Sequence, residues 1–324
     1  RILILILTVA LLVPSAFAMA ATRVNYDMLT YLPEDMDTVV GQNELLEDFN
    51  KGAFTFLIFE DMPNKDVAAL KQQVEQVDHA DTVLWYDSLA DLSIPMEMLP
   101  DKVYQAFNSD HSTMMAVFFD SGTSEDVTMD AVKQIRTICG KQCFVSGMTA
   151  LVVDLKDLCE QEEPIYVALA VTLACVAMLL FLDGWLIPFV FLASIGAMIL
   201  LNMGTNFLCG TISFISNSVT VILQLALAID YAIILCHRFS DEHETKDTRE
   251  ACIAALSKAI PEISSSSLTT ISGLGALAFM HFGIGRDMAT VLIKAILFSL
   301  LSVFTLMPGL LMLFSKKIDA TRHK

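Results

Sequence analysis

The chain has 324 residues, with 20 Lys and Arg against 37 Asp and Glu, so its formal net charge is −17; 55% of the residues are hydrophobic and 18% are charged. An ordinary soluble domain carries about 45–50% apolar and about 25% charged residues. The surplus of apolar residues and the deficit of charge indicate a membrane protein and argue against a purely soluble one.

The acidic charge lies in one block. Residues 22–164 hold 27 Asp and Glu against 9 Lys and Arg, which leaves 10 acidic and 11 basic residues for the rest of the chain. Because no basic patch could neutralise phosphates, the sequence argues against nucleic acid as a partner. It also lacks a zinc-like Cys/His spacing, a glycine-rich nucleotide loop and a Ser/His/Asp set around a nucleophile. We therefore expect no enzyme, and neither a cofactor nor a metal ion.

Six stretches approach or reach the length of about 20 apolar residues that crosses a bilayer. The first ends in Pro14-Ser-Ala-Phe-Ala18, which also resembles a signal-peptidase site, so a cleaved leader is its alternative interpretation. The six stretches are Ile2–Ala20, Ile165–Leu182, Trp185–Asn202, Ile212–Cys236, Ser264–Phe282 and Ala289–Phe314.

The acidic block shows the alternating periods of a mixed α+β domain. The order of its elements is βαββαβ, which resembles the ferredoxin-like split βαβ arrangement. We expect an irregular helical insertion over residues 87–111, which contain Pro95 and Pro100, and an acidic helix Leu151–Glu162 that leads to Pro164. The core elements are predicted at Phe54–Glu60 (strand), Asn64–Val77 (helix), Thr82–Tyr86 and Thr113–Phe119 (strands), Glu125–Ile138 (helix) and Cys143–Ser146 (strand).

Seven cysteines cannot all pair. Cys139 and Cys143 are close enough to bridge across a turn, and the sequence leaves open whether they do. Cys175 and Cys236 lie in apolar stretches, where a thiol packs as a small hydrophobic group.

The basic residues set the expected orientation. They gather in residues 237–262 and in the tail after Phe314, and both belong in the cytoplasm by the positive-inside rule. We therefore expect a first transmembrane helix in residues 1–21, an extracytoplasmic domain over 22–163, five further transmembrane helices over 164–315 and a cytoplasmic tail over 316–324. A cytoplasmic amphipathic helix is expected at about 245–260, along the membrane surface.

Asp230 is the most informative residue of the fourth stretch. Placing Asp near the centre of a membrane helix costs roughly 2.5–3.5 kcal/mol, so such residues face a protein interior or a water-filled path. On a helical wheel Asp230 lies at the edge of a polar stripe, which must face away from lipid. The two interpretations of Asp230 are a group in a proton path and a hydrogen-bonded brace between helices. The stripe consists of Asn217, Thr220, Gln224, Tyr231 and Arg238.

The fifth stretch is rich in small and hydroxyl residues, which allow helices to approach closely. Packing is the simpler role for most of them. Thr269 and Thr270, with Gln224 of the fourth stretch, are candidate hydrogen-bond partners in a relay around Asp230. Lys294 in the sixth stretch is expected to extend to the membrane interface and to take no part in the relay.

The tract Ala226-Leu-Ala-Ile-Asp230-Tyr231, followed by His237-Arg-Phe239 and Asp241-Glu242, resembles the Gly-x-Gly-x-Asp-Tyr…Arg-(Tyr/Phe)…Glu-Glu signature of the resistance-nodulation-division (RND) superfamily, in particular its MmpL-like lipid exporters. Leu268–Gly273 and Leu306-Met-Pro308 are similar to parts of that family's fifth and sixth helices. Asp27–Asp35 resembles the segment that opens its extracytoplasmic porter domain, which favours a retained first span.

The resemblance implies a multi-pass exporter in the cytoplasmic membrane that is driven by the proton-motive force. Asp230 would carry protons, Tyr231 would be its hydrogen-bond partner, and the acidic domain would pass a lipid or another hydrophobic substrate. Ala226 and Ala228 depart from the family's glycines. One six-helix half is present, so the resemblance implies a homodimer, pairing with a sister half, or a longer twelve-helix protein whose other half lies outside this sequence. The alternative is a non-transporting protein of the same fold, such as a sterol-sensing, Patched-like or SecD/SecF-like protein.

Overall fold

The computed structural model describes residues 2–88, 100–182 and 184–321. They form two compact units, which we describe separately. The sheet unit comprises residues 26–160, and the helical unit comprises residues up to 25 and from 161 onward. Helix α6 (Met148–Phe181) belongs to both, because the division falls within it.

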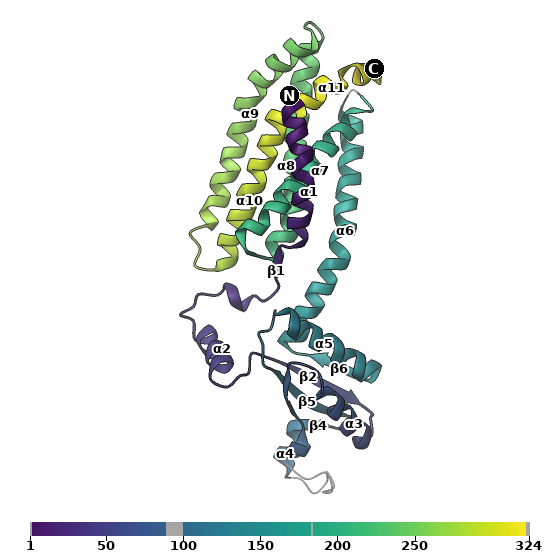
Figure 1. Cartoon of the computed structure of the whole chain (residues 1–324), viewed down its shortest axis with the longest axis vertical. Coiled ribbons are helices and arrows are strands. Elements are labelled where there is room, and N and C mark those ends of the chain that lie inside the picture. The colour runs from purple at the N-terminus through teal and green to yellow at the C-terminus, as the bar shows by residue number, and fades with distance from the viewer. Residues whose placement is uncertain (1, 89–99, 183, 322–324) are drawn as a thin grey trace. The chain divides into compact units, whose positions relative to one another are not determined.

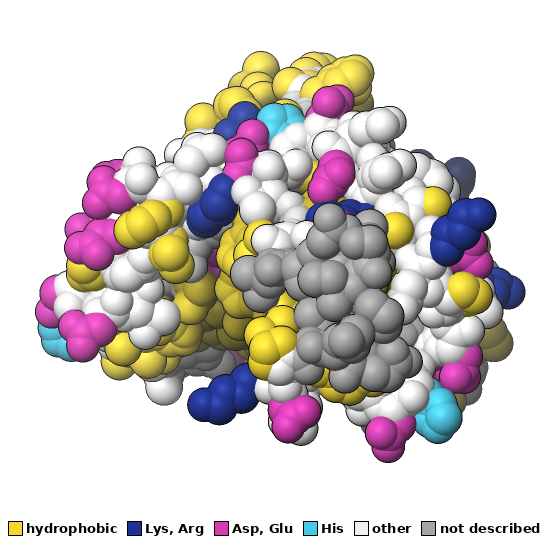
Figure 2. Space-filling view, turned by 90° about the horizontal axis from the view of Figure 1, so that it is seen from below, with side chains coloured by type: hydrophobic (Ala, Val, Ile, Leu, Met, Phe, Trp, Pro, Cys, Tyr) yellow, Lys and Arg dark blue, Asp and Glu magenta, His cyan; other side chains and the backbone are white. Residues whose placement is uncertain are grey.

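The sheet unit contains the six core elements that the sequence predicts, each with ends within three residues of the expected ones. Its main sheet has the order β3-β5-β2-β6, and every neighbouring pair is antiparallel. Figure 2 shows acidic side chains around the face seen from below, with hydrophobic side chains between them. The core elements are β2 (Ala53–Glu60), α3 (Asn64–Val74), β3 (Ala80–Leu84), β5 (Ser112–Phe119), α5 (Asp126–Cys139) and β6 (Cys143–Ser146).

Strand alternation builds the core of this unit. Leu57, Met115 and Val117 point to one face of the sheet and are fully buried, as are Val67 of α3 and Ile135 of α5. Residues of the opposite parity on β2 and β5 are exposed or half-buried. The helices therefore cover one face of the sheet and leave the other more open.

Shorter elements complete the sheet unit. Residues 100–111 of the expected insertion hold a helix and a short strand, whereas Pro95, Met96 and Met98 lie outside the described residues. Met115 of β5 is fully buried in the core. The shorter elements are the 3-10 turns Leu29–Tyr31, Tyr86–Ser88 and Gly140–Gln142, α2 (Asp37–Glu47), α4 (Asp101–Phe107) and β4 (Asn108–Ser109).

The helical unit is a bundle in which α8 contacts α7, α9 and α10 (Figure 1). A hydrophobic cluster of residues from α6, α7, α8, α9 and α11 packs around Phe191, Ile195, Leu235 and Ile263. A short parallel pair joins β1 (Arg23–Asn25) to β7 (Thr211–Ser213). The helices are α1 (Ile2–Ala20), α6, α7 (Ile187–Thr205), α8 (Phe214–His243), α9 (Thr248–Leu277) and α10 (Gly283–Leu301), with a π-helical turn (Ser302–Leu306) that leads into α11 (Met307–Ala320).

Among the described residues, five helical segments are long and apolar enough to cross a membrane. They lie in α1, α6, α7, α8 and the α10–α11 segment. The sequence predicts six. Helix α9, which contains most of the expected span Ser264–Phe282, is not among the five. Its first half carries charges and its second half begins with hydroxyl residues, which lowers its mean hydropathy.

Two expected helix boundaries are wrong. The amphipathic helix expected at 245–260 and the fifth stretch form one helix, because α9 continues through Pro261. The acidic helix Leu151–Glu162 is likewise continuous with the second stretch through Pro164 of α6. A proline inside a helix removes one hydrogen bond and kinks the axis, but it need not end the helix when both flanks favour it.

All seven cysteines are free thiols. Cys139 ends α5 and Cys143 begins β6, on either side of Gly140, whose φ of 66° makes the turn. The two thiols share a hydrogen bond, which lowers the pKa of Cys139 and raises that of Cys143. The pair therefore lies in contact without a bridge.

Candidate functional site

Helix α8 carries the predicted polar stripe. The helix begins at an N-cap, where the Ser213 hydroxyl accepts a hydrogen bond from the Ile215 amide at 3.3 Å. Thr220, Gln224 and Tyr231 are at most 2% exposed and face the bundle interior. The other two members, Asn217 and Arg238, are half-buried.

Asp230 and Tyr231 occupy different sides of α8. The Tyr231 side chain is buried, and its hydroxyl has no hydrogen-bond partner among the described residues. Asp230 is exposed on the helical unit. Its carboxyl group has no hydrogen bond or ion pair within residues 2–88, 100–182 and 184–321. Ala226, one turn earlier, is also exposed. The carboxylate therefore projects from an apolar helix, outside this chain's own packed interior.

Gln224 takes part in a buried amide pair with α7. The Asn202 amide nitrogen donates to Gln224 Oε1 at 3.0 Å, and both side chains are at most 1% exposed. Asn202 Oδ1 and Gln224 Nε2 have no further partner among residues 2–88, 100–182 and 184–321. Gln224 therefore faces α7, and the structure does not bring it to Asp230.

Lys294 of α10 turns inward, and the expectation that it extends to the interface is wrong. Its ammonium group donates to Asn202 O at 3.0 Å, to Thr205 Oγ1 at 3.0 Å and to Asn206 Oδ1. These acceptors lie at the C-terminal end of α7, where the helix dipole places partial negative charge. The end of α7 thus offers three oxygen ligands to a cation inside the bundle.

Asp287 of α10 makes the complementary contact with α8. Its carboxylate accepts from the Ser213 amide at 2.9 Å and from the Ser216 hydroxyl. An acidic group at a helix N-terminus is stabilised by the unpaired amides there. Helix α10 therefore fixes the connection between α7 and α8 with two opposite charges.

The sequence contained a signal for this pair that hydropathy alone misses. Asp287 and Lys294 are seven residues apart, so they share one face of an otherwise apolar helix. Two charges on one such face indicate polar partners on the neighbouring helices.

Thr269 and Thr270 lie in the second half of α9. Their hydroxyls donate to carbonyl groups of their own helix, Ser265 O at 3.0 Å and Ser266 O at 3.2 Å. Thr269 is exposed and Thr270 is half-buried. The structure does not bring either hydroxyl to Asp230.

Ion pairs join the C-terminal end of α8 to the N-terminal half of α9. Arg238 pairs with Glu262 at 3.1 Å, and Glu242 accepts from both Lys246 and Lys258. This cluster fixes the hairpin between the two helices at the end that carries most of the basic residues.

The open face of the sheet unit is apolar. Phe54 and Phe144 are 41% and 55% exposed, and Ile58 lies opposite both Met114 and Phe144 in the sheet register. The Phe54 ring lies 5.7 Å from that of Phe56 and 6.2 Å from that of Phe118. Three neighbouring aromatic rings and the exposed Phe144 thus give this face an apolar surface within an acidic domain.

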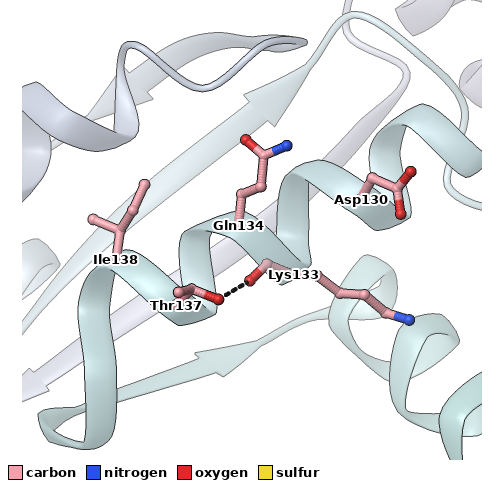
Figure 3. Close-up of a pocket in the computed structure, with 5 residues that line it drawn as sticks. All are labelled: Asp130, Lys133, Gln134, Thr137 and Ile138. Atoms are coloured by element: carbon pink, nitrogen blue, oxygen red, sulfur yellow. Dashed lines mark hydrogen bonds between the residues drawn. The ribbon is translucent and has the colours of Figure 1, made fainter.

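A shallow depression on α5 offers less chemistry. Its five lining residues all come from that helix (Figure 3). Lys133 pairs with Asp157 of α6 at 2.8 Å, and Thr137 donates to the Lys133 carbonyl. In the described part of the chain no group of three or more His, Cys, Asp or Glu side chains is placed to hold a metal ion.

The membrane protein ActII-3 of Streptomyces coelicolor is 28% identical over 138 residues, which are 41% of this chain and 19% of that protein. A crystal structure of SecDF in its super-membrane-facing form is similar with a TM-score of 0.46 and 13% identity, over 97% of this chain and 38% of that one. The chain thus corresponds to well under half of either relative. A model of the MMPL family matches residues 59–324. Because that match covers most of the sequence, the chain belongs to the MMPL family and is an RND-type, MmpL-like multi-pass membrane protein.

Proposed function

We propose that this chain is one half of an exporter that uses the proton-motive force to move a lipid or another hydrophobic substrate out across the cytoplasmic membrane. Asp230 takes up and releases the proton. Tyr231, the hydrogen-bond partner that the family resemblance implies, is buried on another side of α8 and would have to turn toward the carboxyl group to act as that partner. Thr269 and Thr270 are the hydroxyls that would join this relay if α9 turned toward Asp230, whereas Gln224 supports α8 from the side of α7.

The exposed carboxylate of Asp230 supports this proposal most strongly. An ionisable side chain in a membrane helix costs roughly 2.5–3.5 kcal/mol near the centre and is tolerated where it performs a function. A brace between helices would be hydrogen-bonded, but no bond to Asp230 is present in the part of the chain that the structure describes.

The same exposure supports pairing with a second half. Val219, Ile222, Ala226 and Asp230 follow one another at helical spacing on α8, and all are exposed. A partner helix would remove Asp230 from lipid, and Ala226 is small enough to permit a close approach. A homodimer is the simplest assembly, and a sister half is the alternative.

We also propose that the sheet unit is the extracytoplasmic porter domain. Its βαββαβ order and the strand order β3-β5-β2-β6 agree with the split βαβ arrangement. The open apolar face with Phe54, Phe118 and Phe144 suits a hydrophobic substrate better than a charged one. The second half of α9 would provide the sixth crossing, since α9 packs against both α8 and α10.

The test is transport by the reconstituted protein. Wild type and Asp230→Asn are compared in proteoliposomes for movement of a lipophilic dye under an imposed pH gradient, with and without a protonophore. We expect gradient-dependent transport by wild type and its collapse in the folded variant. Equal transport by both would overturn the role of Asp230. If the wild-type protein moved no dye in response to the pH gradient, that result would favour the non-transporting alternative.

A further inference from the structure

A groove runs between three helices of the helical unit, apart from the Asp230 face. Its volume is about 310 Å³, and eleven residues of α1, α7 and the α10–π-helix segment line it. Thr8, Met198 and Leu201 form the floor and are 7%, 3% and 7% exposed. Leu7 and Leu301 form opposite rims and are 56% and 51% exposed. The groove therefore opens toward the surface that faces the bilayer.

The groove is apolar although it contains hydroxyl residues. The Thr8 hydroxyl donates to Ile4 O at 2.9 Å, and the Thr205 hydroxyl donates to Asn202 O at 2.8 Å. The Thr305 hydroxyl donates to Leu301 O. Because these donors are satisfied within their own helices, the lining offers mainly hydrocarbon contacts to an occupant. A water molecule would need two to four polar partners, so water is a poor occupant.

One end of the groove approaches a positive charge that has no acidic partner among the described residues. Thr205 lines the groove and accepts a hydrogen bond from the Lys294 ammonium group at 3.0 Å. Phe298 and Leu301, four and seven residues after Lys294, line the same wall, so Lys294 continues that face of α10 by one turn. The three oxygens that accept from its ammonium group are neutral, and no ion pair to Lys294 is present among the described residues. An anionic group would therefore complement the charge at this end of the groove.

We propose that this groove binds one acyl chain of an anionic bilayer lipid, with the headgroup toward Lys294. An empty apolar groove would forfeit the dispersion contacts of its lining, and in a membrane the molecules available to restore them are lipid chains. An anionic headgroup adds electrostatic attraction to a site in low dielectric, where such attraction is strong. The site is independent of proton transport, so it can exist even where the proposed function fails.

The experiment uses purified protein in nanodiscs of phosphatidylcholine that contain a trace of phosphatidylglycerol with a diazirine-bearing acyl chain. After photolysis, digestion and mass spectrometry, we expect labelled peptides from α1, α7 and α10. The same diazirine chain on phosphatidylcholine should label these peptides less. Labelling spread evenly over all lipid-exposed helices, including the exposed residues of α6, would overturn the site.

A matched pair of variants tests the groove itself. Leu301→Trp places an indole on the rim, whereas Leu297→Trp changes the same residue type on the same helix, at 53% exposure, outside the lining. We expect Leu301→Trp to lower groove labelling about tenfold, the effect of about 1.4 kcal/mol of binding free energy, and Leu297→Trp to leave it unchanged. Both variants must elute as wild type on size exclusion. Equal labelling of the two variants would overturn the assignment of the lipid to this groove.

The headgroup is tested separately. Lys294→Gln keeps hydrogen-bond donors but removes the charge, so the preference for phosphatidylglycerol over phosphatidylcholine should disappear while the labelled peptides stay the same. A preference that persists in Lys294→Gln would overturn the assignment of the anionic headgroup to Lys294.

Discussion

Asp230 and Tyr231 are consecutive residues, yet the carboxyl group is exposed on α8 while the phenol ring is 2% exposed within the bundle. Successive residues of a helix are separated by about 100°, so a pair at the edge of a buried face can divide in this way. Asp230 is therefore available to a partner surface, whereas Tyr231 packs in the interior of its own chain.

Tyr231→Phe removes a buried hydroxyl that has no partner among the described residues. We expect the free energy of unfolding to change by no more than about 1 kcal/mol, because no protein hydrogen bond is lost. Transport should fall less than in Asp230→Asn, since the titrating group remains. Tyr166→Phe, on an exposed position of α6, is the control for loss of a phenol group. Thermal unfolding in detergent measures the effect, and a loss of several kcal/mol would contradict the burial of a free hydroxyl.

Lys294→Met should destabilise the helical unit. The change removes three donors. Asn202 O keeps the Thr205 hydroxyl as a donor, whereas Asn206 Oδ1 loses the ammonium group, which costs roughly 1–3 kcal/mol if that buried acceptor stays unsatisfied. Lys316→Met, at an exposed position of α11, is the matched control. Chemical unfolding of both variants is the measurement. The inward orientation of Lys294 would be contradicted if the two variants were equally stable.

The orientation is tested by cysteine labelling. In a variant without native cysteines, a cysteine at Lys65 should react with an impermeant maleimide from outside the cell, and one at Lys246 should react only after lysis. Both positions are exposed, so access from either side depends on the membrane alone. The topology rests on short basic loops and a six-helix count, whereas hydropathy supports five spans in the described residues. The three helices α6, α7 and α8 separate the two positions, so reversed labelling would overturn the orientation and leave the number of crossings between them unchanged.

The strands of the sheet unit were predictable because their alternation is local. β6 has the expected ends, Cys143–Ser146, and β2 and β5 each differ by one residue. Helix continuity through Pro164 and Pro261 was not predictable, because flanking residues compensate for the missing amide of a proline.

The site shows the same division between local and non-local information. The inward direction of Thr220, Gln224 and Tyr231 followed from the wheel of α8. The contacts of Lys294 could not be derived, because they depend on which helix end packs against α10. Hydropathy assigns a lysine near a helix end to the interface, whereas the carbonyl groups at the end of α7 offer it a partner inside the bundle.

The thiols of Cys139 and Cys143 should form a disulfide under mild oxidation. They already share a hydrogen bond across a turn, and this bond lowers the pKa of Cys139. One thiolate would attack oxidised glutathione, and the other would displace glutathione from the mixed disulfide, with two glutathione thiols released in total. Intact mass after alkylation distinguishes the bridged form, and Cys139→Ser is the control. Full alkylation of both thiols after oxidation would contradict the expectation.

The assembly prediction uses the exposed face of α8. In a variant without native cysteines, Ala226→Cys places a thiol one turn before Asp230, and a two-fold partner that covers this face would bring two such thiols together. Oxidation in the membrane should then yield a species of twice the 35.6 kDa mass of the chain. Leu297→Cys, which is exposed on α10, serves as the control and should stay monomeric. A sister half in place of a second copy would give a cross-linked species of another mass. If Ala226→Cys stays monomeric like the control, then Asp230 is not covered by a second copy of α8, and the homodimer is wrong.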